Sequence, residues 1–272
     1  MLSILLALAQ PAPCEARLLS YADWKPAPNQ AWDLALAAPG GGAVVLIGAE
    51  HLRDPQAPQF AHIAARFAAA RPSRVFFEGP DRGTETDADT AIRNMGESGY
   101  LRFLAKQANI PAASLEPSPI EQLAGLRGTF SDERILLFFL LREAARLRDR
   151  EGKAGDALDA AVTNLLARSS AVAERAGLQA SITDVASLAA AAAREWPGRD
   201  WRTLPGNWFS PLGQDPDAGY LTAINAANSS FRNLHMLRLF TTAARQGDRV
   251  FAVVGRNHVP MLDPALRCAL AG

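Results

Sequence analysis

The sequence has few of the residues that report chemistry most directly, since its 272 residues include only two cysteines and four histidines. Net charge is absent as well, because 28 Lys and Arg residues balance 28 Asp and Glu residues. No overall field therefore draws the chain to nucleic acid or to anionic lipid, and we expect no nucleic-acid partner. Beyond its first residues the chain also lacks any run near the roughly 20 apolar residues of a membrane span. These absences favour a protein with no stable membrane span whose function depends on a small, specific binding or catalytic site.

The first residues form the longest apolar run. Met1 to Gln10 reads MLSILLALAQ, and the run ends in a small-x-small pattern, Ala-Leu-Ala, that a signal peptidase accepts. We predict that residues 1–20 contain a signal peptide or leader and the start of the mature chain, which makes the protein periplasmic or secreted. The run is short and has no basic residue before it. Two alternatives therefore stay open: part of a longer leader, or a buried helix in a cytoplasmic protein.

The two cysteines bear on the compartment. Cys14 follows the predicted cleavage point, and Cys268 lies near the other end of the chain. Because chain termini often lie close together, a disulfide formed in an oxidising compartment is one interpretation. Two unrelated free thiols are the other.

Strands and helices alternate at both ends of the sequence. With 49% hydrophobic residues, 272 residues are enough for one large core, so we predict a single α/β domain over 21–272. Alternation predicts a mostly parallel central sheet flanked by helices. The expected strands are 43–47, 74–78, 112–116 and 249–254, and the expected helices beside them are 58–70, 99–109, 218–246 and 261–270.

The middle of the chain differs, because it is rich in Ala, Leu and Arg and has almost no strand pattern. We predict a helical insertion over about 131–200, with one helix that begins at Ser131 and others over 154–176 and 183–194. The segment 196–219 holds three of the five tryptophans and is predicted to be an ordered loop that lines a binding site.

Two Gly-x-x-His motifs, Gly48 to His51 and Gly255 to His258, follow the first and last expected strands. Ligands of an open parallel sheet gather outside the carboxyl ends of its strands. Each glycine lets the backbone turn sharply, so that His51 and His258 point across that edge. A single such motif arises often by chance and its histidine often bonds only the backbone. Two motifs in a chain of four histidines favour a site.

Glu78 ends another expected strand, where a buried and unpaired carboxylate is costly. We predict that His51, His258 and Glu78 are the ligands of a divalent metal, manganese, cobalt or zinc. A metal-free alternative has a histidine and a glutamate activate water directly.

Other residues are secondary candidates. Glu50 is a second candidate base, although neighbouring residues rarely point the same way. Glu116 precedes a proline and is more typical of a turn or cap. Arg232, on the long helix one turn before His235, can hold a carboxylate or stabilise an oxyanion, or else form a simple salt bridge. His62 is expected to pack within its helix.

Five segments carry a resemblance to known proteins. They are GAEH at 48–51, VFFEGP at 75–80, SLEPSPIEQLAGL at 114–126, SSFRNLHML at 229–237 and VFAVVGRNHVPML at 250–262. In this order and spacing the chain resembles the TraB, Tiki and erythromycin-esterase-like superfamily, which includes a ChaN-like branch. The likeness covers roughly residues 40–126 and 220–270.

The resemblance implies a split α/β core whose reactive centre contains His51, His258, Glu78 and Arg232. Tiki-like members are metal-dependent proteases, erythromycin-esterase-like members are hydrolases that use His and Glu on water, and ChaN-like members are haem-binding lipoproteins. The pair Ala49-Glu50 falls between the patterns of these branches.

The leading hypothesis is therefore a metal-dependent hydrolase, a peptidase or esterase, whose peptide or small-molecule substrate enters beside the loop 196–219. The alternative is a non-catalytic haem- or ligand-binding protein. A third possibility is a degenerate relative that only binds partners.

Overall fold

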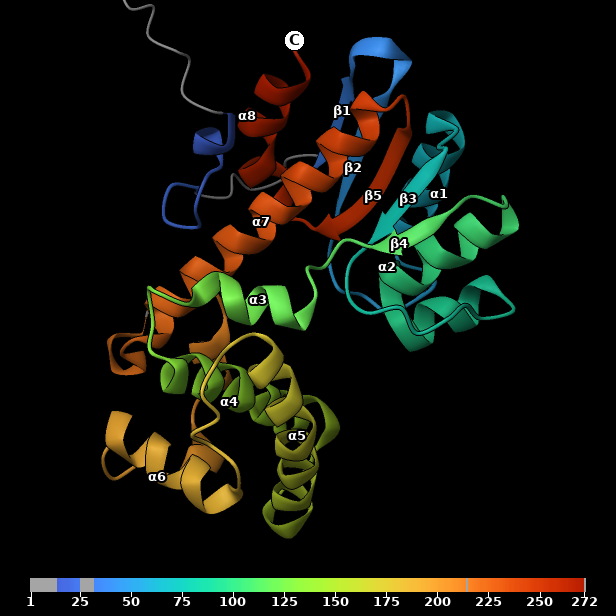
Figure 1. Cartoon of the computed structure of the whole chain (residues 1–272). Helices are drawn as coiled ribbons and strands as arrows, with labels where there is room; N and C mark the ends of the chain where they lie inside the picture. The colour runs from blue at the N-terminus through green and yellow to red at the C-terminus, as the bar shows by residue number, and fades with distance from the viewer. Residues whose placement is uncertain (1–13, 25–31, 214, 272) are drawn as a thin grey trace, which may run out of the picture. The chain divides into compact units, whose positions relative to one another are not determined.

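The computed structural model describes residues 14–24, 32–213 and 215–271, so most of the predicted leader lies outside the described residues. The chain divides into two compact units (Figure 1). The first unit is Met1–Glu116 together with Asn233–Gly272, and the second is Pro117–Arg232. The predicted helical insertion, about 131–200, lies within the second unit, which extends further in both directions.

The first unit contains a five-stranded sheet in the order β1-β2-β5-β3-β4. Four strands are parallel to their neighbours, and only β1 is antiparallel, to β2. The predicted class, an α/β fold with a mostly parallel sheet flanked by helices, is confirmed. The strands are β1 (Asp33–Ala37), β2 (Ala43–Ala49), β3 (Arg74–Phe77), β4 (Ala112–Ser114) and β5 (Arg249–Gly255).

Strand β1 was not predicted from the sequence. It is an edge strand of five residues that begins with Asp33, and Leu34 is its only buried residue. A short edge strand with one face in solvent lacks the continuous apolar run that marks the buried strands β2 and β5.

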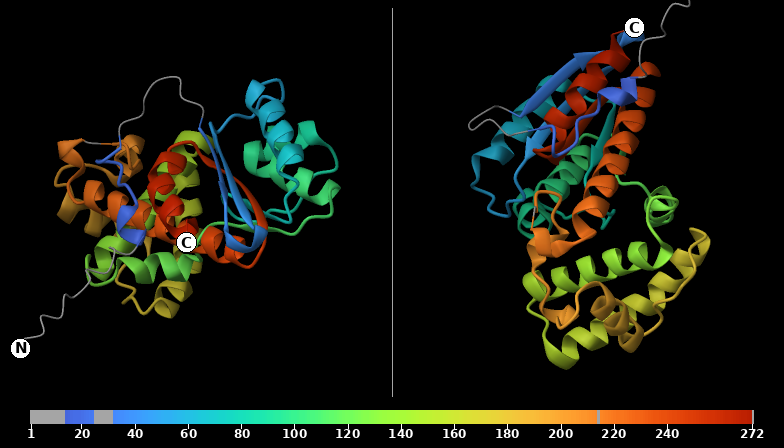
Figure 2. Two further views of the ribbon diagram at one scale, coloured as in Figure 1. Left: turned by 90° about the horizontal axis from the view of Figure 1, so that it is seen from above. Right: turned by 90° about the vertical axis from the view of Figure 1, so that its left-hand side faces the viewer.

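The central strands are apolar throughout because both faces of the sheet are covered. On one face Leu46 and Val254 pack in a cluster with Phe240 of α7 (Leu221–Arg245). On the other face Ile47 and Phe251 pack with residues of α1 (Pro58–Ala70). Figure 2 shows α1 and α2 on one side of the sheet and α8 with the end of α7 on the other. This two-sided cover leaves the carboxyl ends of the strands as the place for a site.

Helix α1 of the first unit starts where it was predicted to start, whereas α2 and α8 start earlier. Helix α1 has the predicted bounds, 58–70. Helix α2 (Ala88–Gln107) begins earlier than predicted because Asp87 caps it, accepting a hydrogen bond of 2.8 Å from the Thr90 amide. Gly96 interrupts it with φ 60° and ψ −144°, which obscured the helical pattern. Helix α8 (His258–Leu270) also begins earlier, at the second motif histidine.

A disulfide joins Cys14 to Cys268, with 5.5 Å between the Cα atoms. It fixes the short 3-10 helix η1 (Cys14–Arg17) to α8. The Leu19 amide also donates to the Met261 carbonyl, at 3.1 Å. Of the two interpretations of the cysteines, the structure shows the disulfide.

The second unit is helical, and its core is built from leucines and from the predicted tryptophan-rich segment. Ser131 is the N-cap of α4, as predicted, and accepts a hydrogen bond from the Arg134 amide. Trp196, Trp201 and Trp208 are all buried in this core. The helices are α3 (Pro119–Leu126), α4 (Asp132–Glu151), α5 (Gly155–Arg175) and α6 (Val185–Glu195), with 3-10 helices η3 (Trp201–Thr203), η4 (Gly206–Phe209) and η5 (Pro216–Ala218).

No helix in the described ranges combines the length and the apolar character that a bilayer crossing needs.

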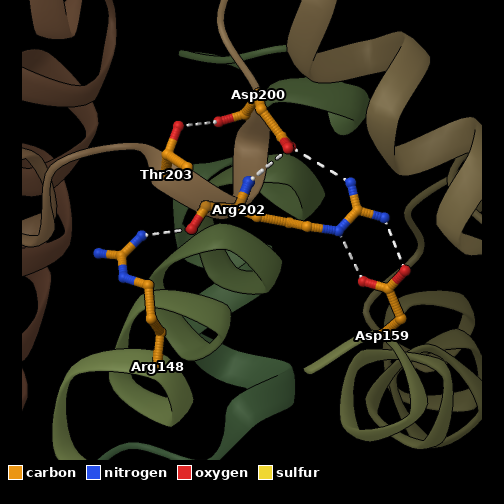
Figure 3. A network of polar contacts seen from close by, with 5 residues as sticks. All are labelled: Arg148, Asp159, Asp200, Arg202 and Thr203. Atoms are coloured by element: carbon orange, nitrogen blue, oxygen red, sulfur yellow. Dashed lines mark hydrogen bonds and ion pairs between the residues drawn. The ribbon is translucent and has the colours of Figure 1, made fainter. Parts of the chain in front are cut away.

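One polar network ties the tryptophan-rich segment to α4 and α5 (Figure 3). Arg202 donates two parallel hydrogen bonds to the Asp159 carboxylate, at 2.7 and 2.6 Å, and a third to Asp200 at 3.2 Å. Arg148 of α4 donates to the Arg202 carbonyl at 2.7 Å. The hydrogen bonds from Arg202 lower the pKa of the Asp159 carboxyl below its ordinary value.

Because folding lowers the pKa of Asp159, the stability of the second unit depends on pH. A carboxyl whose pKa is lowered by folding stabilises the protein above its unfolded pKa and loses that contribution as the pH falls through the folded pKa. We expect Asp159→Asn to lower the unfolding free energy at neutral pH by about 1 kcal/mol, allowing for the partial exposure of the pair. Urea unfolding followed by tryptophan fluorescence measures this. As the pH falls below the ordinary pKa of an aspartate, the difference between variant and wild type should shrink, and a gap of equal size at neutral and at acid pH would contradict the assignment.

Candidate functional site

The two Gly-x-x-His motifs lie side by side. Strands β2 and β5 are parallel neighbours, and their register places Ala49 opposite Gly255. Beyond the strands the Arg256 amide donates to the Ala49 carbonyl at 3.0 Å. The side chains of Glu50 and Arg256, one from each motif, form an ion pair. The two turns are therefore bonded to each other.

The first turn requires its glycine and is held by α1. A Cβ at Gly48 would lie 2.6 Å from the Trp32 Cβ and 2.9 Å from the Arg256 Cα, so no other residue fits without movement. Gln59 of α1 binds both backbone groups of Glu50, donating to the carbonyl at 2.8 Å and accepting from the amide at 3.0 Å. These contacts fix the backbone from which His51 projects.

Three predicted ligands converge on Gly255. A Cβ built there would lie 3.4 Å from Glu78 Oε2, 3.7 Å from His51 Nε2 and 3.7 Å from His258 Cδ2. The Gly255 amide donates to Glu78 Oε2 at 2.7 Å and so orients the carboxylate. We call His51, Glu78 and His258 the Gly255 cluster. Its two histidines differ in exposure, because the His51 side chain is 66% exposed whereas His258 is 4% exposed.

Glu97 of α2 positions His51. Its Oε1 lies 2.6 Å from His51 Nδ1, and its own side chain is only 7% exposed. A Cβ at Gly96 would lie 2.9 Å from the Leu52 carbonyl oxygen, so the glycine break in α2 allows the helix to pass close to the first motif. Sequence reasoning missed Glu97. The signal was present as an acidic residue between two glycines in an otherwise helical segment, Gly96 to Gly99.

Asn233 of α7 positions His258. Its Oδ1 lies 2.6 Å from His258 Nδ1, and Asn233 is 1% exposed. Sequence reasoning missed this residue too, although it follows Arg232 directly. Because Oδ1 can only accept, Nδ1 of His258 is the protonated nitrogen, and in the neutral ring Nε2 carries the lone pair. The Glu97 carboxylate imposes the same tautomer on neutral His51.

The turn after Glu78 is held by the strand beside it. Ser114 Oγ donates to the Gly79 carbonyl at 2.7 Å and accepts from the Glu116 amide at 3.1 Å. Glu116 Oε1 accepts from the Gly79 amide at 3.4 Å. These bonds are the turn role that the sequence suggested for Glu116.

The remaining candidates lie elsewhere. Glu50 is 55% exposed and paired with Arg256, so its role as a base stays a prediction. Arg232 ends the second unit, and its role in catalysis also stays a prediction. The expectation for His62 was wrong, because its side chain is 49% exposed and bonds Asp33 at 2.8 Å.

No family model, curated protein or solved structure gives a significant match to this chain. The superfamily resemblance therefore rests on the sequence motifs, and both the superfamily and its branch stay predictions.

The Gly255 cluster has the donor types of a divalent-metal site. Among residues 14–24, 32–213 and 215–271, no three His, Cys, Asp or Glu side chains are grouped closely enough to hold a metal ion as they stand. Two imidazoles and one carboxylate are nevertheless a common ligand set for zinc, manganese, cobalt or iron. Each imidazole also has the acceptor on Nδ1 that metal-binding histidines typically have. The cluster therefore matches a metal site in the types of its donor atoms and in the acceptors bonded to Nδ1 of its two histidines.

Removing the carboxylate behind His51 should weaken the site without removing a ligand. We expect Glu97→Gln to lower metal affinity, and with it activity, by about 10–100-fold, as for other groups that orient a metal-binding histidine. Calorimetric titration with manganese or zinc measures the affinity. Circular dichroism checks the fold, and Glu85→Gln is the control, because Glu85 is a half-buried carboxylate outside the cluster that accepts a hydrogen bond of 2.8 Å from Asn94 of α2. Unchanged metal affinity in a folded Glu97→Gln variant would contradict a positioning role.

Proposed function

We propose that this protein is a hydrolase that activates water at the Gly255 cluster, with a divalent cation, to cleave a peptide or an ester bond. The observation that carries the proposal is the convergence of His51 Nε2, Glu78 Oε2 and the His258 ring on one point beside Gly255. Glycine at that point leaves room for a reacting group between the three side chains.

The residues of the cluster have different parts in this proposal. His258 is buried, and the bond from its Nδ1 to the Asn233 amide oxygen fixes the direction of its Nε2. Glu78 is oriented by the Gly255 amide and presents a carboxylate toward the same point. His51 is exposed and backed by a carboxylate, so it lies on the side that substrate reaches. A divalent cation, when bound, would lower the pKa of a water molecule and polarise the carbonyl under attack.

The metal-free alternative uses the same residues. His51 Nε2 accepts the proton of the attacking water, and the Glu97 carboxylate stabilises the imidazolium that forms. The Glu97 bond at 2.6 Å supports this route as well. The two routes differ in whether a chelator abolishes hydrolysis.

We also propose that the protein works outside the cytoplasm. The Cys14–Cys268 disulfide supports this, because structural disulfides persist in oxidising compartments and are rare in the cytosol.

The test begins with protein stripped by chelator and refilled with manganese, cobalt or zinc, assayed against peptide and ester libraries. We expect one of these ions to bind and to restore hydrolysis. Gly255→Ala should abolish both, because its methyl group occupies the point between the three side chains at distances of 3.4–3.7 Å and so without a severe clash. The control is Ala252→Gly, which changes one methyl group in β5, the strand that contains Gly255. Gly247→Ala is not a suitable control, because Gly247 has a φ of 94°.

Two results would argue against the hydrolase, and each points to a different conclusion. Refilled protein with neither bound metal nor hydrolysis would contradict the proposal. A Soret band on addition of haem, lost on replacing His51 or His258, would establish the haem-binding alternative.

A further inference from the structure

A cavity of about 310 Å³ lies within the second unit between α3, α4 and α5. On α5 its lining residues are Leu165, Arg168, Ser169 and Val172, whose spacing places them on one helix face. Helices α3 and α4 each contribute one face in the same way. The cavity is therefore formed by three converging helix faces.

The walls of this cavity are mainly apolar and incompletely covered. Phe139, Leu165 and Val172 line it, and each is only half-buried. The volume falls at the lower end of those that bind small molecules. A ligand with an aliphatic chain would remove this apolar surface from water, which favours binding in proportion to the area covered.

The polar part of the lining is positively charged. Arg142 and Arg168 line the cavity, and its lining includes no Asp or Glu. The Arg142 guanidinium lies 5.0 Å from the centre of the Phe139 ring, so the charge and the apolar wall adjoin. Arg168 is exposed, and its side chain makes no hydrogen bond or ion pair with another residue of the described part of the chain. An arginine fork matches the two oxygens of a carboxylate.

We propose that this cavity binds a medium-chain aliphatic carboxylate, with its chain between α3, α4 and α5 and its carboxylate at Arg168 and Arg142. The charge selects an anion over a cation, and the apolar walls select a chain over a small anion. The lining of this cavity shares no residue with the Gly255 cluster, so the proposed binding does not rest on the proposed hydrolase activity.

Calorimetric titration of the full chain with decanoate tests the proposal. We expect saturable binding of one decanoate per chain. Hexanoate, four methylenes shorter, should bind about 100-fold more weakly, and the cation decyltrimethylammonium at least about tenfold more weakly. Equal affinity for decanoate and the cation would overturn the proposal, as would the absence of decanoate binding.

Two variants locate the bound carboxylate. Arg168→Gln changes an exposed side chain and should weaken decanoate binding about tenfold, whereas Arg175→Gln, exposed on the same helix but outside the lining, should not. Ser169→Trp should fill the cavity and abolish binding. His51→Ala should leave decanoate binding unchanged, which separates this proposal from the hydrolase. Decanoate affinity that is unchanged in Arg168→Gln would refute the assignment even if Ser169→Trp fails to fold.

Discussion

His51→Ala should lower kcat/KM for the hydrolysed substrate by about 10²–10⁴-fold and leave the fold intact. The loss is expected because His51 supplies either a metal ligand or the proton acceptor, and positioned groups of this kind contribute about that factor. The fold should survive because the His51 side chain is 66% exposed, although the variant should unfold more easily, since the buried Glu97 carboxylate loses its partner. Steady-state kinetics on the metal-loaded protein, with circular dichroism beside them, measure both effects.

His62→Ala is the matched control. His62 is also an exposed histidine hydrogen-bonded to a carboxylate, Asp33, but it lies on α1 outside the Gly255 cluster. It should retain full activity. Equal losses in His51→Ala and His62→Ala would show that the effect is general rather than local to the cluster, and would contradict the proposed site.

Replacing both cysteines with serine should lower the unfolding free energy of the first unit by about 4–5 kcal/mol at most, and its Tm by on the order of 10 °C. The expectation is large because the disulfide joins residues 254 positions apart and so restricts a long loop of the unfolded chain. Thermal melting of the double variant Cys14→Ser, Cys268→Ser measures the loss. Loss of the disulfide should also let η1 separate from α8 more readily.

The control for the disulfide uses a reducing agent. Because Cys14 and Cys268 are the only cysteines, reduction should lower the Tm of wild type toward that of the double variant and leave the double variant unchanged. A wild-type Tm that is the same with and without reductant would contradict a stabilising role for the disulfide.

The features that sequence predicted well are those set by neighbouring residues. Helix α1 has the bounds predicted for it, 58–70, and α4 begins at the predicted Ser131 cap. The rule that parallel strands end at one edge of the sheet predicted both Gly-x-x-His turns at that edge. That β2 and β5 are direct neighbours there was learned only from the structure. Local chemistry and topology together were enough to bring His51, Glu78 and His258 near each other.

The residues that sequence missed come from distant segments. Glu97 reaches His51 across 46 positions, and Asn233 reaches His258 across 25. Glu97 lies before the helix predicted over 99–109, and Asn233 lies within the helix predicted over 218–246, whose apolar spacing does not indicate a partner for it. Strand β1 was missed for another reason, since a short edge strand with one buried residue resembles a loop. Side-chain pairing between segments depends on packing, which helical periodicity does not encode.

We propose that His51, His258 and Glu78 together hold one divalent cation beside Gly255. Anomalous diffraction from crystals soaked with manganese or zinc locates such an ion. We expect one strong peak about 2.0–2.2 Å from Nε2 of each histidine and from a Glu78 oxygen. A peak at other residues, or full hydrolytic activity in crystals without a peak beside Gly255, would contradict the claim.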